Sequence, residues 1–77
     1  MTQAFILVTC EPKKEPQVKE DLLMIPELED AQQVFGAYDC IAKTKDLPPK
    51  KIRQLIANKI RNLSRVRTTL TLNTEEK

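Results

Sequence analysis

A strand-like hydrophobic pattern recurs along the chain. Gln3 to Cys10 is an apolar run of strand length with large side chains at both parities, which predicts a central strand covered on both faces. Leu28 to Phe35 is more polar and alternates only loosely, as expected of an edge strand, and Tyr38 to Thr44 is the strand that returns beside it. Gly36, the only glycine, lies between these two strands, so we expect it to supply a positive φ for a hairpin turn.

The last strand-like segment, Val66 to Leu72, alternates more regularly. We expect one face to carry Val66, Thr68, Leu70 and Leu72, and the other face to carry Arg67, Thr69 and Thr71. The tail after it, residues 73–77, should fray, as chain ends commonly do.

Helical spacing is found in two segments, of which the first is short. Pro16 suits the first turn of a helix, where its missing N–H would be unpaired in any case. Val18, Leu22 and Ile25 then form one apolar stripe. The helix should end before Pro26, because a proline disfavours the helical conformation of the residue that precedes it.

The second helical segment gives the strongest periodic signal in the chain. Asp46 is a candidate N-cap, and Pro48 and Pro49 are tolerated in a first turn. The apolar positions of the helix body follow helical spacing and are Ile52, Leu55, Ile56, Ile60 and Leu63.

The predicted order of elements is strand, helix, strand, strand, helix, strand. Right-handed crossovers in both halves then give an α+β, ferredoxin-like βαββαβ fold, with a four-stranded antiparallel sheet and both helices on one face. The first and third strands are central in this arrangement. Because the first strand is apolar at both parities, the face without helices should be covered by the same face of a second copy. We therefore predict a dimer closed sheet against sheet.

The length of 77 residues and the formal net charge of +2 predict a single small domain over residues 1–77. A monomer of this size would be marginally stable, so a partner surface is expected. No apolar run is long enough to span a bilayer and residues 1–3 do not resemble a signal peptide, so we expect a cytoplasmic protein without membrane contact. Cys10 and Cys40 should then stay reduced and act as small buried hydrophobic residues.

Charge is distributed unevenly along the sequence. Acidic side chains outnumber basic ones in residues 1–47, and basic side chains outnumber acidic ones in residues 48–77. Three interpretations are open: a solvated helix face, docking between oppositely charged regions of two copies, or weak nucleic-acid binding through Lys50, Lys51, Arg53 and Lys59.

The side chains that catalysis and metal binding usually need are scarce. The chain has no His, which removes the usual general base at neutral pH and the commonest transition-metal ligand. It also has no phosphate-binding glycine motif and no C-x-x-C pair. We therefore expect no enzyme activity, no catalytic residue, no metal site and no cofactor.

The same βαββαβ order is found in an RNA-binding module that stacks bases on aromatic residues of its central strands. The aromatic residues here are only Phe5, Phe35 and Tyr38, and the third strand, with Cys40 to Lys43, has none at its centre. The stacking platform is therefore missing. No helix-turn-helix segment is present either, so we expect no direct DNA binding.

The hairpin around Gly36 contains the residues in this sequence that best suit the binding of a small ligand. Backbone N–H groups of the turn could bind a carboxylate and the Asp39 side chain could bind an ammonium, which together would recognise a free amino acid. The alternative is an ordinary turn in which Asp39 accepts from local backbone donors. In either case, an aspartate at the rim of the sheet should contribute little to the core.

Three motifs, considered together, resemble a known family. They are Ile25-Pro26-Glu27-Leu28, Gly36-x-Tyr38-Asp39 at the hairpin, and Val66-x-x-Thr69-x-Thr71 after the second helix. This set resembles the RAM module, which binds effectors and mediates oligomerisation in the leucine-responsive regulatory protein/AsnC family of transcription regulators. The resemblance implies effector-site roles for Gly36, Tyr38 and Asp39, with Ala37 nearby in the same turn. Thr69 and Thr71 match the terminal-strand motif and are further candidates for the effector site.

The resemblance also implies an assembly and a function. Modules of this family pair their sheets into dimers and assemble dimers into rings such as an octamer, with amino-acid effectors bound between dimers. The family's usual DNA-binding domain is absent, so the chain resembles a stand-alone module that modulates transcription regulators, alone or with full-length relatives. Two alternatives stay open: a structural assembly module without a ligand, and a weak nucleic-acid-binding protein.

Overall fold

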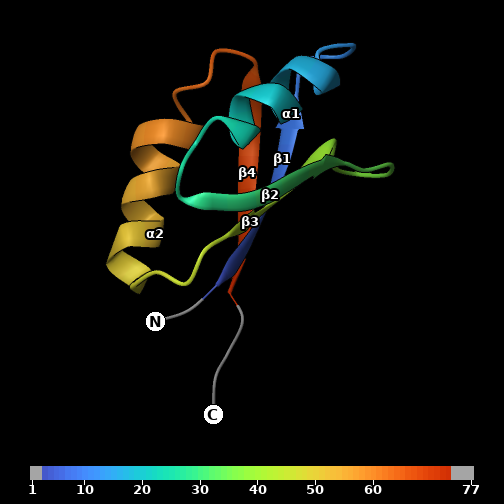
Figure 1. Ribbon diagram of the computed structural model, residues 1–77. Coiled ribbons are helices and arrows are strands. Elements are labelled where there is room, and N and C mark those ends of the chain that lie inside the picture. Colours follow the sequence, from blue (N-terminus) through green and yellow to red (C-terminus); the bar gives the residue numbers. More distant parts are fainter. Residues whose placement is uncertain (1–2, 74–77) are drawn as a thin grey trace.

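The computed structural model describes residues 3–73, and its elements follow the predicted order (Figure 1). They are β1 (Ala4–Cys10), α1 (Glu15–Leu23), β2 (Leu28–Gln33), β3 (Cys40–Thr44), α2 (Pro49–Leu55), the π-helical turn η1 (Ile56–Ile60) and β4 (Val66–Asn73). The strands form one antiparallel sheet in the order β2-β3-β1-β4, so β1 and β3 are central and the ferredoxin-like α+β prediction is confirmed. The expected frayed tail falls mainly on residues 74–77, outside the described residues, and Asn73 belongs to β4.

The core lies between the sheet and the helices. β1 alternates strictly, with one set of side chains buried beneath the helices and the other set half-buried on the opposite face. The buried set is Ala4, Ile6, Val8 and Cys10. The helices contribute Val18 and Leu22 from α1, Ile52 and Leu55 from α2, and Ile56 and Ile60 from η1. Both cysteines are buried and free, as predicted.

The ends of both helices differ from the predicted ones. α1 ends at Leu23, and the buried Ile25 lies after it in the loop instead of completing the helical stripe. α2 begins at Pro49 with Pro48 in the extended N-cap conformation, and no side chain caps it. The predicted capping role of Asp46 is wrong, because the two prolines place the first turn beyond its reach.

The second helix is also not a single regular α-helix. Regular α-helical structure stops at Leu55 and one π turn, η1, carries the chain on to Ile60. Ile56 and Ile60 are both buried at the two ends of this turn. Leu63, predicted as the last helical position, lies beyond the turn and packs against the core while partly buried.

A β-bulge changes which face Val66 occupies. The register pairs Thr9 with Thr68 but Cys10 with Val66, so β4 contains one extra residue at this point. Val66 therefore lies on the helix side and packs against the core, together with the buried Cys10. The prediction that Val66 shares a face with Leu70 is wrong, whereas Thr68, Leu70 and Leu72 do line the open face, opposite Thr9, Leu7 and Phe5.

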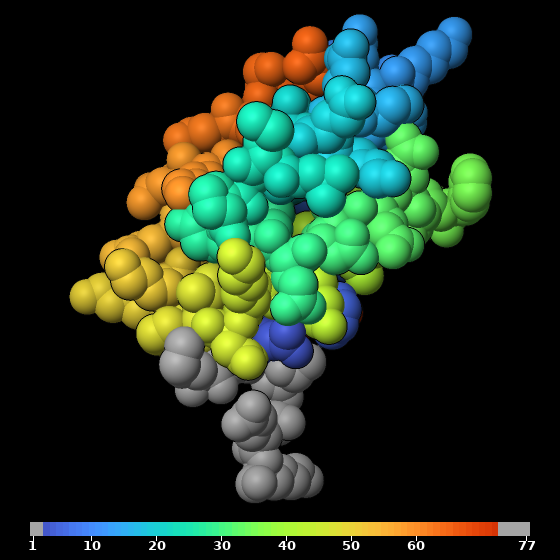
Figure 2. Space-filling view, in the orientation of Figure 1, coloured from blue at the N-terminus to red at the C-terminus, as the bar shows by residue number. Residues whose placement is uncertain are grey.

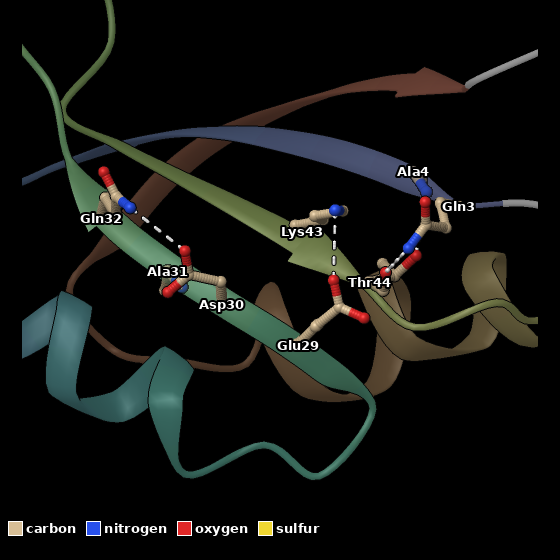
Figure 3. A network of polar contacts seen from close by, with 8 residues as sticks. All are labelled: Gln3, Ala4, Glu29, Asp30, Ala31, Gln32, Lys43 and Thr44. Carbon is tan, nitrogen blue, oxygen red and sulfur yellow. Dashed lines mark hydrogen bonds and ion pairs between the residues drawn. The ribbon is translucent and has the colours of Figure 1, made fainter.

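At the other end of the sheet, a side-chain hydrogen bond joins the end of β3 to the start of β1 (Figure 3). Thr44 at the end of β3 is fully buried, and its hydroxyl oxygen accepts a hydrogen bond from the Ala4 N–H at 2.9 Å. On the open face next to it, Lys43 pairs with Glu29 of β2 at 3.2 Å. Within residues 3–73, no helix is both long enough and apolar enough to cross a membrane.

Candidate functional site

The segment between β2 and β3, residues 34–39, projects from the body of the molecule (Figures 1 and 2). β2 ends at Gln33 and β3 begins at Cys40, so both strands are shorter than predicted and Phe35 is fully exposed on the projecting segment. Gly36 has a φ of +127°, which confirms the predicted positive φ. An added Cβ would meet nothing within 4 Å, so backbone conformation rather than space requires a glycine here.

Hydrogen bonds fix the base of the hairpin to the central strand. The Val34 N–H donates to the Asp39 carbonyl oxygen, and the Asp39 N–H donates to the Val8 carbonyl oxygen, both at 2.9 Å. The Asp39 carboxylate also accepts from the Cys10 N–H, with its Oδ2 at 2.9 Å. Asp39 therefore connects the hairpin to the end of β1 through its backbone and its side chain, contacts that the expectation of a small contribution to the core did not include.

A hollow of about 380 Å³ lies between the hairpin and the start of α1. It brings together three of the predicted site residues, Gly36, Tyr38 and Asp39. Ala37 is exposed in the turn and is not among the lining residues. The lining is completed by Glu15, Pro16, Gln33, Val34 and Phe35.

The electrostatic character of this hollow is negative. Glu15 and Asp39 contribute two carboxylates, and none of the lining residues is basic. Burial raises the pKa of the neighbouring Cys10 thiol to about 11, and the negative charges of Asp39 and Glu15 act in the same direction. Burial, followed by the same two carboxylates, also raises the pKa of Cys40. Both thiols therefore stay protonated and unreactive at neutral pH.

The tip of the hairpin offers hydrogen-bond donors. Within residues 3–73, the backbone N–H groups of residues 35–38 donate to no protein acceptor. Exposed backbone N–H groups of a turn can donate to a carboxylate, and carboxylates such as those of Glu15 and Asp39 can accept from an ammonium group. Among the described residues, both carboxylates also accept a backbone hydrogen bond, Asp39 from the Cys10 N–H at 2.9 Å and Glu15 from the Lys13 N–H at 3.3 Å.

Thr69 and Thr71 lie elsewhere in the molecule. They belong to β4 and line two other hollows, apart from the hairpin. Val8 pairs with Cys40 on one side and Thr69 on the other, so β1 separates Thr69 from the base of the hairpin by roughly 10 Å, or two strand spacings. Within one copy of the chain, these two threonines and the hairpin do not form one site.

The sequence pattern did not identify Glu15, Pro16 or Phe35 as site residues. The Cys40 thiol donates to the Glu15 carbonyl oxygen at 3.8 Å, which places the start of α1 over the start of β3. The sequence predicted a helix starting near Pro16, but its position over β3 depends on packing that periodicity does not specify. Phe35 was predicted to be the last residue of a strand, so its full exposure on the hairpin was not expected.

Comparisons with known proteins identify the family and the fold. The family model of the Lrp/AsnC ligand-binding domain matches residues 3–75. The solved structure of FFRP-DM1 is 37% identical with a TM-score of 0.90, covering 97% of this chain and 100% of that one. A hypothetical protein from Pyrococcus horikoshii is 36% identical with a TM-score of 0.90, covering 100% of this chain and 93% of that one.

A more distant structure shares the fold alone. It is a transcriptional regulator from Neisseria meningitidis in complex with L-Met, 16% identical with a TM-score of 0.82, and the match covers 99% of this chain and 51% of that one. None of the curated protein sequences gives a significant match. The family model covers nearly the whole chain, and the fold agrees with those of the similar solved structures. The chain belongs to the Lrp/AsnC ligand-binding domain family.

Proposed function

We propose that this chain is a non-enzymatic module of one domain, which binds an amino-acid effector and oligomerises to modulate transcription regulators of the leucine-responsive/AsnC type. The observation that carries the proposal is a hollow that brings the Glu15 and Asp39 residues together with the glycine turn, whose backbone N–H groups have no acceptor among residues 3–73. A free amino acid is the smallest ligand that would use the carboxylates and the N–H groups at once. The L-Met complex of the regulator from Neisseria meningitidis supports this class of ligand.

The hollow is open to solvent where Phe35 projects, so we infer that a neighbouring copy completes its walls. The fully exposed Phe35 ring would supply an apolar contact to that copy. The proposed assembly is a dimer that closes through the open sheet face and then forms a larger ring such as an octamer. Full-length relatives are proposed partners, DNA would be contacted only through them, and the proposed location is the cytoplasm.

A structural assembly module without a ligand is the second candidate. It is favoured by the open sheet face, where Phe5, Leu7 and Ile41 form a half-buried apolar surface next to the exposed Leu70 and Leu72. That surface would pair two copies whether or not the hairpin binds anything. Nucleic-acid binding is less favoured, because Lys59, one of its four candidate contacts, is engaged by both carboxylate oxygens of Glu27 at 2.8 Å.

The test is a thermal-melting screen of the chain against all proteinogenic amino acids, with an Asp39→Asn variant. Ligand at about 100 times its Kd adds about 2.7 kcal/mol per site, and each kcal/mol raises the Tm of a small domain by roughly 4–8 °C. The asparagine keeps an acceptor for the Cys10 N–H while removing the charge that would bind the ammonium. We therefore expect a selective shift in the parent chain and its loss in Asp39→Asn.

Asp46→Asn is the matched control, because it makes the same chemical change at an exposed position away from the hollow. An equal response in Asp39→Asn and the parent chain would remove Asp39 from the site. Unchanged melting of the parent chain across the whole panel would favour the structural assembly module.

A further inference from the structure

A second groove runs along the outer edge of β4, beside α2 and η1. The helical segment lies alongside β4 (Figure 1), and two adjoining hollows of about 410 and about 300 Å³ share Arg61 as a lining residue. We refer to the two hollows together as the β4 groove. It is lined by Arg53, Ile56, Ala57, Arg61, Val66, Arg67, Thr68, Thr69 and Thr71.

The charge of the β4 groove is positive and uncompensated. Arg53, Arg61 and Arg67 line it, and its lining includes no acidic residue. Within residues 3–73, these three arginines form no ion pair, whereas Lys43, Lys59 and Arg65 each pair with a carboxylate. The groove therefore presents three guanidinium groups without a paired carboxylate among the described residues.

The π turn brings two of these arginines onto the same side of the helix. In a regular α-helix each residue turns by about 100°, so residues eight apart, like Arg53 and Arg61, would differ by about 80° around the axis. One extra residue in the π turn reduces this difference to about 20°. Both side chains then point along the same edge of β4, in agreement with their shared lining of one hollow. π turns are found frequently at functional sites.

The edge strand adds neutral donors to the groove. Among residues 3–73, β4 pairs only with β1, so its outer edge carries backbone N–H groups that no described strand satisfies. The half-buried Thr69 and Thr71 add hydroxyl groups on the helix side. Guanidinium, hydroxyl and backbone N–H groups together are the donors that proteins use for phosphate oxygens.

We propose that the β4 groove is a second binding site, which takes a small phosphate-bearing anion such as a di- or triphosphate. Each hollow is in the size range of a small-molecule site. None of the lining residues is aromatic, so the groove lacks the stacking surface that single-stranded nucleic acid uses. The site is separate from the acidic hollow at the hairpin, where a phosphate would be repelled, and it does not depend on amino-acid binding there.

The test is calorimetric titration with tripolyphosphate and with ATP, at low and at physiological salt. Arg61→Gln is the key variant, because Arg61 lines both hollows, and loss of one charge-assisted contact should weaken binding about tenfold. Arg67→Gln should weaken it in the same direction. Lys50→Gln, with the same charge change on an exposed residue outside the groove, should leave the Kd unchanged.

Three other outcomes would overturn the proposal. Equal losses in Arg61→Gln and Lys50→Gln would indicate non-specific charge attraction, and no heat with either probe would exclude the site. A 20-nucleotide single strand that binds more tightly than tripolyphosphate and loses affinity in Arg61→Gln would assign the groove to nucleic acid instead. Asp39→Asn should bind tripolyphosphate normally, which keeps this result independent of the hairpin.

Discussion

At the scale of single residues, the Asp39 carboxylate lies where the hairpin meets β1 and has two roles, one in the fold and one in the proposed binding site. One oxygen accepts from the Cys10 N–H, next to the bulge that shifts the register of β4. The same side chain lines the hollow in which we place the ammonium group of an effector. An alanine at this position would remove both interactions together, and only a substitution that keeps the acceptor separates binding from folding.

The Cys10 thiol, next to Asp39, should make the stability of the fold depend on pH. Its pKa rises from 9.0 to about 11 in the folded chain, chiefly through burial and next through Asp39. The folded chain thus holds the thiol proton more tightly than the unfolded chain. This contribution to stability is fully present below pH 9 and is lost as the pH rises toward about 11.

We therefore expect the urea midpoint of unfolding to fall between pH 9 and pH 11, and to fall less steeply in Cys10→Ala. The difference between the pH profiles of the two proteins is the quantity to measure. Parallel pH profiles would show that the Cys10 thiol does not contribute.

At the scale of elements, the ends of strands and helices depend on contacts that the hydrophobic pattern does not contain. All four strands and both helices were predicted from periodicity, because burial on one face leaves a clear repeat. The bulge at Val66 and the π turn at residues 56–60 each insert one residue and shift the phase of the residues beyond it. A local pattern of apolar residues fits the regular and the shifted phase almost equally well, so neither insertion could be predicted.

The junction of β1 and β3 offers a test at this scale. Thr44 is fully buried and satisfies the Ala4 N–H through its hydroxyl (Figure 3). Thr44→Val preserves the shape but leaves that donor unpaired, so we expect a loss of about 1–3 kcal/mol in the free energy of unfolding by urea. Thr44→Ser keeps the hydroxyl and should lose less. A valine variant as stable as the parent chain would contradict this account.

At the scale of the whole molecule, the two faces of the sheet have different roles. The helix side holds the core, whereas the open side presents Phe5, Leu7, Ile41, Leu70 and Leu72. The sequence predicted this second apolar face from the double parity of β1. The family resemblance implied one site for Gly36, Tyr38 and Asp39, and these three residues line one hollow. The sequence could not predict Glu15, whose place in the hollow depends on how α1 crosses β3.

The open face should control the mass of the protein in solution. Leu70 is 44% exposed, so Leu70→Lys should cost the single chain little while placing a charge in the proposed dimer interface. We expect light scattering to show a fall from the oligomeric mass to that of one chain. Leu23→Lys is the control, since Leu23 is 50% exposed on α1, on the side away from the open face. Equal masses for the parent chain and Leu70→Lys would place the interface elsewhere.

The pairing of β1 with β4 also has a consequence for protein engineering. Ala4 pairs directly with Asn73, so the first and last described elements meet at the same corner of the sheet. A short linker could join these two positions, and new termini could be opened in the exposed segment at residues 11–14 without removing any residue of the core. Because the two ends of the described chain lie side by side, the whole module could also be inserted into a surface loop of a host protein without separating the two ends of that loop.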